Sequence, residues 1–267
     1  MSVYTFIDGQ YLRSRYETIM KTLYGEVPPI DFSLLTFGAL KSYYYDAIDE
    51  SPKDTETQKE FDDRVRPRRE LHQYINQLAN FHVREGYVRK GVKREQKAVD
   101  VMLAVDALEH AARGNLSAAH LVVGDLDFEP LVKSLVRLGV QVVIHYSPLS
   151  VSEELLNAAD MRQRITARDC WDWTFNDFRR NNQPFQIASP PSPMSQFATD
   201  YTIYKAGKWN KRQVTVFKPN STTSASALVV EQGKELLQDP ITMWHNTDPS
   251  RLGVALELSF GGKVEWD

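Results

Sequence analysis

Apolar residues recur along residues 1–145 in two alternating patterns. Short β-prone runs with few charges alternate with longer segments whose apolar residues are spaced three and four positions apart. The short runs predict strands at residues 3–7, 41–48, 81–88, 120–123 and 140–144. The longer segments predict helices at residues 10–24, 60–80, 97–113 and 128–138. Strands that alternate with helices favour an α/β fold with a doubly wound, mainly parallel sheet.

The pattern changes after about residue 180. Residues 181–197 are rich in asparagine, serine and proline, which predicts a stiff linker. Beyond it we expect two strands within residues 201–218 around a turn at Gly207, a helix near residues 228–237 and a last strand at residues 254–260. The chain thus divides into a domain at 1–180, a linker at 181–197 and a small α+β module at 198–267.

Composition narrows the class of protein. The single cysteine, Cys170, excludes an internal disulfide framework and a cysteine-based zinc site. No apolar run approaches the roughly 18 residues that a membrane-spanning helix needs, and the first residues lack the pattern of a signal peptide. We therefore expect a cytoplasmic protein with no membrane partner.

Charge is segregated along the chain, although the net charge is only -3. Residues 46–63 carry eight acidic and two basic side chains, whereas residues 64–97 carry ten basic and three acidic ones. A local excess of positive charge favours a polyanion as partner. The alternative is a solvated surface on which the two segments pair with each other.

Several aspartates fall where a parallel sheet places its ligands. Asp8 follows the first predicted strand, and Asp125 and Asp127 follow the strand at 120–123. Asp100 shares a helix face with apolar residues three, four and seven positions on, so a buried carboxylate is expected. Clustered carboxylates repel one another unless a hard cation neutralises them. Oxygen ligands of this kind suit Mg²⁺ or Mn²⁺.

Each aspartate also has a purely structural explanation. Asp8 could form a tight turn with Gly9, Asp125 could accept backbone N–H groups in its loop, and Asp127 could cap the following helix. Asp106 could form only surface ion pairs. The coincidence of four acids at strand ends or on a core-facing helix favours a shared site.

Four segments resemble the NYN domain family, a PIN-like nuclease group that includes LabA-like proteins. Residues 6–10 (Phe-Ile-Asp-Gly-Gln) resemble its opening Asp-Gly motif, and residues 97–108 resemble its Lys-Gly-Val-Asp segment with a second Asp six residues on. Residues 123–132 are similar to its Ser-Gly-Asp-x-Asp-Phe-x-Pro-Leu segment, and residues 152–160 to a late leucine-rich segment that ends in Asp. The resemblance covers about residues 1–170.

The resemblance implies a PIN-like α/β fold and metal-dependent cleavage of RNA phosphodiester bonds. By position, Asp8, Asp100, Asp125 and Asp127 would be the catalytic, metal-holding residues, and Asp106 and Asp160 match further family acids. Tyr11 stands where many members have Asn, Ala98 replaces the usual Gly and Val123 the common Ser. All carboxylates of the motifs are retained, so the Tyr11 exchange bears mainly on substrate positioning.

The leading hypothesis is a Mg²⁺- or Mn²⁺-dependent ribonuclease that acts on single-stranded RNA. Five basic residues just upstream of Asp100 are the expected phosphate contacts: Arg89, Lys90, Lys93, Arg94 and Lys97. The alternative is a catalytically weakened NYN-fold protein that binds RNA or acts as a scaffold. A third class, an Asp-x-Asp phosphatase or nucleotide-sugar transferase, is disfavoured because haloacid-dehalogenase-type phosphatases carry that motif after the first strand.

The C-terminal module offers a second candidate surface. Residues 201–218 interleave four aromatic with five basic residues and contain no acid, a composition that could form a stacking platform for bases. The alternative is a two-stranded ribbon whose aromatics lie in the core. A homo-oligomer or a protein partner that binds through this module is also compatible with the sequence.

Overall fold

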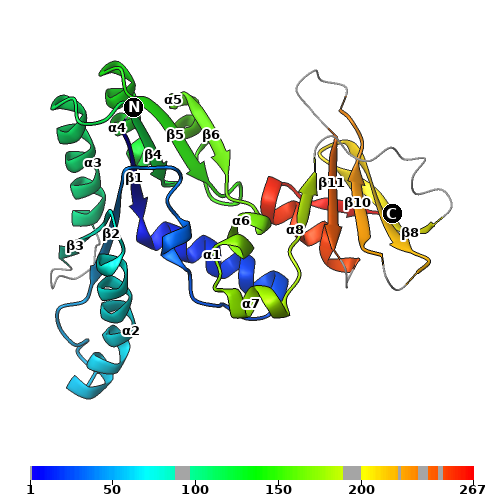
Figure 1. The fold of residues 1–267 in the computed structure, drawn as a ribbon, viewed down its shortest axis with the longest axis horizontal. Helices are drawn as coiled ribbons and strands as arrows, with labels where there is room; N and C mark the ends of the chain where they lie inside the picture. The colour runs from blue at the N-terminus through cyan, green and yellow to red at the C-terminus, as the bar shows by residue number, and fades with distance from the viewer. Residues whose placement is uncertain (1, 88–96, 189–199, 222–223, 234–239, 246–248) are drawn as a thin grey trace. The chain divides into compact units, whose positions relative to one another are not determined.

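The computed structural model describes residues 2–87, 97–188, 200–221, 224–233, 240–245 and 249–267 (Figure 1). They form two units. The first contains residues 1–15, 31–146 and 150–163, and the second contains residues 16–30, 147–149 and 164–267. No helix in these ranges is long and apolar enough to cross a membrane.

The first unit is built on a six-stranded sheet with the order β3-β2-β1-β4-β5-β6. The central pairs β3/β2, β2/β1, β1/β4 and β4/β5 are all parallel, which confirms the predicted α/β fold. The strands are β1 (Val3–Asp8), β2 (Lys41–Ile48), β3 (Phe81–Tyr87), β4 (Ala118–Val122), β5 (Gln141–Tyr146) and β6 (Met161–Arg164).

Helices connect these strands, and the first four of them lie where the periodicity predicts helices. They are α1 (Gly9–Tyr24), α2 (Gln58–Gln77), α3 (Lys97–Ala112), α4 (Glu129–Arg137) and α5 (Glu153–Ala158), with two 3-10 turns, η1 (Phe32–Leu34) and η2 (Leu126–Phe128). One face of the sheet packs on α3 and α4, where Phe6, Leu121 and Ile144 from strands meet Leu103 and Leu135 from the helices. All five side chains are fully buried.

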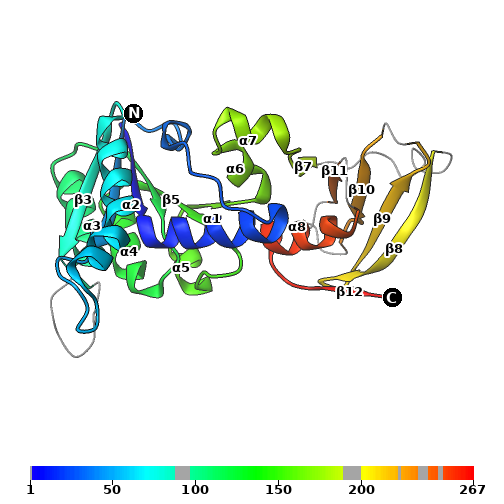
Figure 2. The same ribbon diagram turned by 90° about the horizontal axis from the view of Figure 1, so that it is seen from below.

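The chain reverses its direction of winding between β1 and β4. From β1 it proceeds to β2 and β3 on one side, and it returns to β4 on the other side of β1. Such a switch point leaves a crevice beyond the carboxyl ends of the two strands, where open α/β sheets bind their ligands. Figure 2 shows α1 leading directly out of this end of β1.

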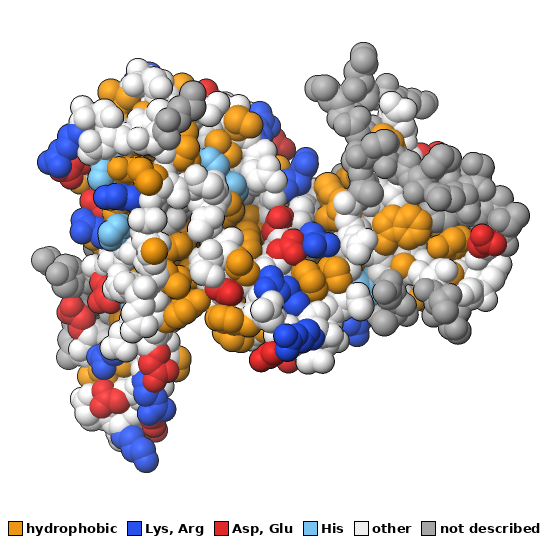
Figure 3. Space-filling view, viewed as in Figure 1, with side chains coloured by type: hydrophobic (Ala, Val, Ile, Leu, Met, Phe, Trp, Pro, Cys, Tyr) orange, Lys and Arg blue, Asp and Glu red, His pale blue; other side chains and the backbone are white. Residues whose placement is uncertain are grey.

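The charged segments at 46–63 and 64–69 pair with each other. Arg64 contacts Asp49 and Glu56, and Arg66 contacts Asp63. Figure 3 shows acidic and basic side chains intermixed over α2. The part of the basic run that lies on α2 is therefore a mutually neutralised surface, as the second of our two interpretations of the charge pattern predicted.

The second unit contains an antiparallel sheet with the order β12-β8-β9-β10-β11-β7. Its strands are β7 (Gln186–Ala188), β8 (Tyr201–Trp209), β9 (Arg212–Pro219), β10 (Ser226–Val230), β11 (Ile241–His245) and β12 (Val264–Trp266), and its helices are α6 (Ala167–Asp172), α7 (Asn176–Asn181) and α8 (Ser250–Phe260). The segment expected as a linker, 181–197, thus contains the end of α7 and the edge strand β7, while residues 189–197 lie outside the described ranges.

Three local predictions in this unit are wrong. The turn of the β8–β9 hairpin lies at Asn210 and Lys211, which both have positive φ, and not at Gly207. Gly207 lies within β8, where a Cβ would overlap the Glu265 carbonyl oxygen of β12. A primed turn with Asn in the left-handed region gives the hairpin its twist, and the glycine serves close strand packing instead.

The other two errors concern element type. Of the helix expected near residues 228–237, residues 228–230 instead belong to the fully buried strand β10, and residues 234–237 lie outside the described ranges. Residues 254–260, expected as a strand, belong to α8, whose buried Leu252, Ala255, Leu256 and Ser259 follow helical spacing. The apparent alternation of Val254, Leu256 and Leu258 misled because a short apolar run fits both periods.

Candidate active site

A pocket of about 590 Å³ lies at the switch point of the parallel sheet. Its walls come from the end of β1, the first turns of α1, the start of α3, the β4–η2 loop and the β5–α5 loop. The lining residues are Asp8, Gln10, Tyr11, Ser14, Arg15, Asp100, Gly124, Asp125, Leu126, Ser150, Val151 and Ser152. Three of the four aspartates predicted as catalytic are therefore brought to one pocket.

Asp8 is the last residue of β1 and also fixes the start of α1. Its carboxylate accepts the backbone N–H of Tyr11 at 3.0 Å, so the side chain is held at the floor of the pocket. Burial raises the pKa of Asp8 to about 6, and the negative charge of Asp100 adds to the shift, while the N–H groups of Tyr11 and Gln10 oppose it. An unneutralised carboxylate is thus costly at this position.

Asp100 lies in the first turn of α3 and lines the pocket, but it is exposed and not buried as the helix pattern predicts. The same helix face buries Leu103 and Ala107 deeper in the structure. Asp100 lies at the first turn of that face, where the helix borders the pocket. Partial desolvation raises its pKa, and the charges of Asp125 and Asp127 raise it further.

Asp125 and Asp127 lie in the short turn that follows β4. Asp125 lines the pocket and caps η2, since its carboxylate accepts the Asp127 N–H at 3.2 Å. The structural alternative for Asp127, capping of the next helix, is not observed, because Phe128 occupies the N-cap of α4 and makes no side-chain cap bond. Asp127 is exposed and acts on Asp100 through its charge, without lining the pocket itself.

Asp106 and Asp160 lie elsewhere. Asp106 is six residues after Asp100 on α3, about 240° further around the helix, and so points away from the pocket. Its carboxylate accepts two bonds from Arg84, at 2.8 and 3.1 Å, and one from the Tyr45 hydroxyl. Asp160 accepts the backbone N–H of Val142 at 2.8 Å. Both carboxylates have structural partners.

The oxygen donors that line the pocket have the chemistry that a hard divalent cation prefers. Asp8, Asp100 and Asp125 line one pocket, and Asp8 and Asp100 have raised pKa values because burial and neighbouring carboxylates disfavour their charges. Within the described ranges, however, no three His, Cys, Asp or Glu side chains lie close enough together to hold a metal ion. Binding of a cation would have to draw these carboxylates together.

Tyr11 forms a wall of the pocket and packs against Gly124. A Cβ at Gly124 would overlap the Tyr11 ring and would lie 2.6 Å from the carbonyl oxygen of Ser150. The glycine between Val123 and Asp125 is thus required by the close approach of Tyr11 and of the β5–α5 loop. Tyr11, which stands where many members of the resembled family have Asn, therefore packs closely against Gly124.

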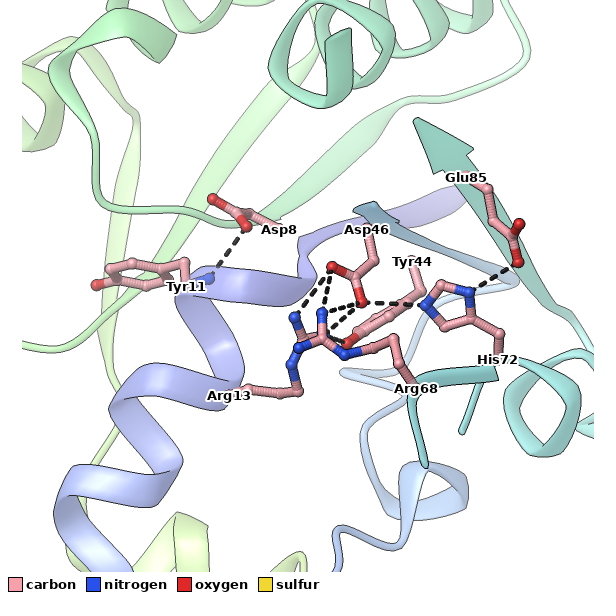
Figure 4. A network of polar contacts seen from close by, with 8 residues as sticks. All are labelled: Asp8, Tyr11, Arg13, Tyr44, Asp46, Arg68, His72 and Glu85. Carbon is pink, nitrogen blue, oxygen red and sulfur yellow. Dashed lines mark hydrogen bonds and ion pairs between the residues drawn. The ribbon is translucent and has the colours of Figure 1, made fainter. Parts of the chain in front are cut away.

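A buried charge network beside the pocket was missed by the sequence interpretation (Figure 4). Asp46, at 0% exposure, accepts paired bonds from Arg13 and contacts Arg68 and the Nε2 of His72. Burial alone would raise the Asp46 pKa, but the His72 and Arg13 bonds and the Arg68 charge lower it to about 2. His72 Nδ1 lies 2.8 Å from Glu85.

This network ties α1 to β2 and α2 and so supports the helix that carries Tyr11. Asp46 follows Tyr45, the register partner of Asp8 on the neighbouring strand. In the sequence it looked like the first member of a solvated acidic run. The signal that could have identified Asp46 is its place within the tyrosine-rich strand β2, because a strand that is buried on both faces also buries the polar residues it contains.

The other predicted contacts have mixed outcomes. Arg89, Lys90, Lys93 and Arg94 lie outside the described residues, and Lys97 is the first residue of α3. In the second unit, Trp209 and Phe217 are buried, so the aromatic platform is reduced to Tyr201 and Tyr204, and Tyr201 packs against Phe217 in a small apolar cluster. The alternative of an ordinary ribbon with core aromatics describes this hairpin better.

Comparison with known proteins places the first unit in a family. The family model for the NYN domain matches residues 2–165, more than half of the chain. No curated protein matches. Among solved structures, a protein of unknown function from Vibrio parahaemolyticus is 19% identical with a TM-score of 0.45, covering 61% of this chain and 92% of that one. A presumed oxidoreductase from Parabacteroides merdae is 9% identical with a TM-score of 0.28, covering 96% and 88%.

These two structural likenesses are too weak to carry an argument about function. The family match coincides with the segments at 6–10, 97–108, 123–132 and 152–160, and it spans every residue that lines the pocket. The chain belongs to the NYN domain family.

Proposed function

We propose that this chain is a metal-dependent ribonuclease whose active site is the acidic pocket at the β1/β4 switch point. The observation that carries the proposal is the presence of Asp8, Asp100 and Asp125 in one pocket of a PIN-like fold. NYN and PIN-like domains are generally nucleases, and an acidic pocket of this kind suits phosphodiester hydrolysis.

Asp8, Asp100 and Asp125 would hold one or two Mg²⁺ or Mn²⁺ ions, and Asp127 would add negative charge at the edge of the site. When bound, such a cation supplies an activated water and positive charge beside the scissile phosphate. The chain itself contributes rigid placement. The Tyr11 N–H fixes Asp8, and the Asp127 N–H fixes Asp125 at the start of η2.

RNA is the substrate that we propose, and single-stranded RNA in particular. The chain carries five basic residues at 89–97; four of them lie outside the described residues, and the fifth, Lys97, begins α3 three residues before Asp100 in the sequence. These side chains would neutralise backbone phosphates that would otherwise be repelled by the carboxylates.

The test is cleavage of an end-labelled single-stranded RNA by the full chain, with Mn²⁺ or Mg²⁺ and in EDTA. We expect metal-dependent cleavage that is lost in the Asp8→Asn/Asp125→Asn double variant. Asp160→Asn is a suitable control, because Asp160 bonds only to the backbone of β5 in the described structure. Cleavage that survives the double substitution would refute the site.

The second candidate is an NYN-fold RNA-binding or scaffolding protein with weakened catalysis. Two observations favour it: Tyr11 fills the position at which many family members carry Asn, and no three acids of the described residues are close enough to bind a metal as they stand. RNA binding without metal-dependent turnover would support this candidate. A partner for the C-terminal module, whether protein or a second copy, stays a prediction.

A further inference from the structure

The acidic pocket also contains a cation, Arg15, that the sequence interpretation did not assign. Tyr11 and Arg15 are four residues apart on α1 and therefore lie on the same side of the helix. Both line the pocket, together with Ser14. One pocket thus combines carboxylates from β1, α3 and the β4–η2 loop with a guanidinium from α1.

Among the described residues, Arg15 has no anionic partner. Its Nη2 donates to the Ser14 hydroxyl at 2.8 Å, and its buried Nε meets no acceptor in the described part of the chain. None of the ion pairs found among the described residues involves Arg15. Asp8, Asp100 and Asp125 line the same pocket, yet none of them contacts it within ion-pair distance.

Arg13, only two residues earlier, behaves in the opposite way. Its guanidinium is held by both oxygens of Asp46 and by the Tyr44 hydroxyl (Figure 4). Arg13 has its anion inside the protein, whereas Arg15 lines the pocket without one. The two arginines of α1 therefore have different roles, and Arg13 has the structural role of joining α1 to Asp46 on β2.

A buried guanidinium N–H without an acceptor is unfavourable until an acceptor arrives. The fork of N–H groups on arginine matches the oxygens of a phosphate. A phosphate diester carries one negative charge and could therefore pair with the Arg15 guanidinium. The carboxylates across the pocket would repel this phosphate unless a cation or Arg15 offsets their charge.

We propose that Arg15 binds a non-bridging phosphate oxygen of the RNA backbone inside the pocket, as a positioning residue for the strand. The choice of RNA as ligand rests on the proposed function. The competing explanation is that Arg15 only balances the charge of the three aspartates. The two differ in which ligand responds when Arg15 is replaced.

The experiment measures RNA binding separately from RNA cleavage. The affinity of the full-length Asp8→Asn/Asp125→Asn variant for a single-stranded RNA is titrated in EDTA at several salt concentrations, with and without Arg15→Gln. We expect Arg15→Gln to weaken binding about tenfold and to reduce the slope of log affinity against log salt by about 0.7, the value for one lost phosphate contact on a single strand.

Two further variants control the interpretation. Arg137→Gln is the matched control, because Arg137 also donates to a serine hydroxyl, that of Ser134, but does not line the pocket. Arg15→Lys keeps the charge and loses the fork, so it should retain the salt slope with weaker affinity. Far-UV circular dichroism shows that each variant is folded.

Equal affinity and equal salt slope for the Arg15→Gln protein and its parent would overturn the proposal, as would the absence of RNA binding by the parent. Unchanged RNA affinity, together with stronger Mn²⁺ binding by a chain that carries Arg15→Gln alone than by the wild-type chain in buffer without EDTA, would establish the charge-balancing role instead. Failure of the proposed function would be a different result, namely no metal-dependent cleavage by the wild-type chain. The RNA affinities with and without Arg15→Gln could still be compared in that case.

Discussion

Asp8→Asn is expected to stabilise the metal-free protein at neutral and alkaline pH. The Asp8 pKa rises from 3.8 to about 6 in the folded chain, mainly because the carboxylate is desolvated. A raised carboxyl pKa means that the folded state binds a proton more tightly than the unfolded state. Stability is therefore highest below about pH 4 with respect to this group, falls as the pH rises through 6, and stays reduced above it.

The size of the effect follows from the same shift. Each pKa unit corresponds to about 1.4 kcal/mol, so ionised Asp8 costs the folded chain about 3 kcal/mol at pH 8. Asn removes the charge and keeps an oxygen that can accept the Tyr11 N–H, so the cap of α1 is preserved. The substitution should therefore recover most of this free energy.

The assay is urea unfolding followed by far-UV circular dichroism, in EDTA, at pH 8 and pH 4. Asp8→Asn should raise the free energy of unfolding by about 2–3 kcal/mol at pH 8 and by much less at pH 4. Asp106→Asn is the matched control, since it removes a carboxylate that Arg84 and Tyr45 both use, and it should lower stability at pH 8. A destabilised Asp8→Asn protein at pH 8 would refute the electrostatic reasoning about the pocket.

Three further predictions follow from the geometry. At Mn²⁺ concentrations below saturation, RNA cleavage should decline as the pH falls through about 6, because protons compete with the cation for Asp8 in the metal-free chain; a rate at limiting Mn²⁺ that stays flat between pH 5 and 7 would contradict this role. Asp46→Asn should lower the free energy of unfolding by about 3–5 kcal/mol, measured by urea unfolding, because it leaves the partly buried Arg13 guanidinium without the carboxylate that holds it. Gly124→Ala should reduce both stability and cleavage, because the new methyl group overlaps the Tyr11 ring and the Ser150 carbonyl oxygen. A second substitution, Tyr11→Asn, removes the ring but not the backbone overlap, so it should restore stability only in part, and urea unfolding that shows no gain at all would contradict the contribution of the ring.

The parallel sheet and three of its carboxylates could be predicted because both follow from local pattern. Short apolar runs that alternate with segments of helical spacing are compatible with few sheet topologies. The first polar residue after a buried strand lies at the carboxyl end of that strand, where such sheets bind their ligands. Asp8 and Asp125 were found by that rule. Asp100 was found for a partly wrong reason, since its apolar neighbours are buried but the residue itself extends beyond the core.

The remainder depends on contacts between distant segments, which spacing alone does not encode. Asp46 counted as a surface acid until the structure placed Arg13, Arg68 and His72 around it. Arg15 looked like any exposed helix residue because the loops that complete the pocket are more than 100 positions away in the chain. The helix at Ser250–Phe260 was mistaken for a strand, because tertiary packing selects between two periods that a short apolar run fits equally.

The most direct test of the central claim is the rate at which the full chain cleaves a single-stranded RNA as Mn²⁺ is added, compared with its Asp125→Asn variant. We predict cleavage that requires Mn²⁺, stops in EDTA and falls at least about 100-fold in the variant. Cleavage at the same rate in EDTA, or by the variant, would contradict the assignment of the acidic pocket as a metal-dependent ribonuclease site.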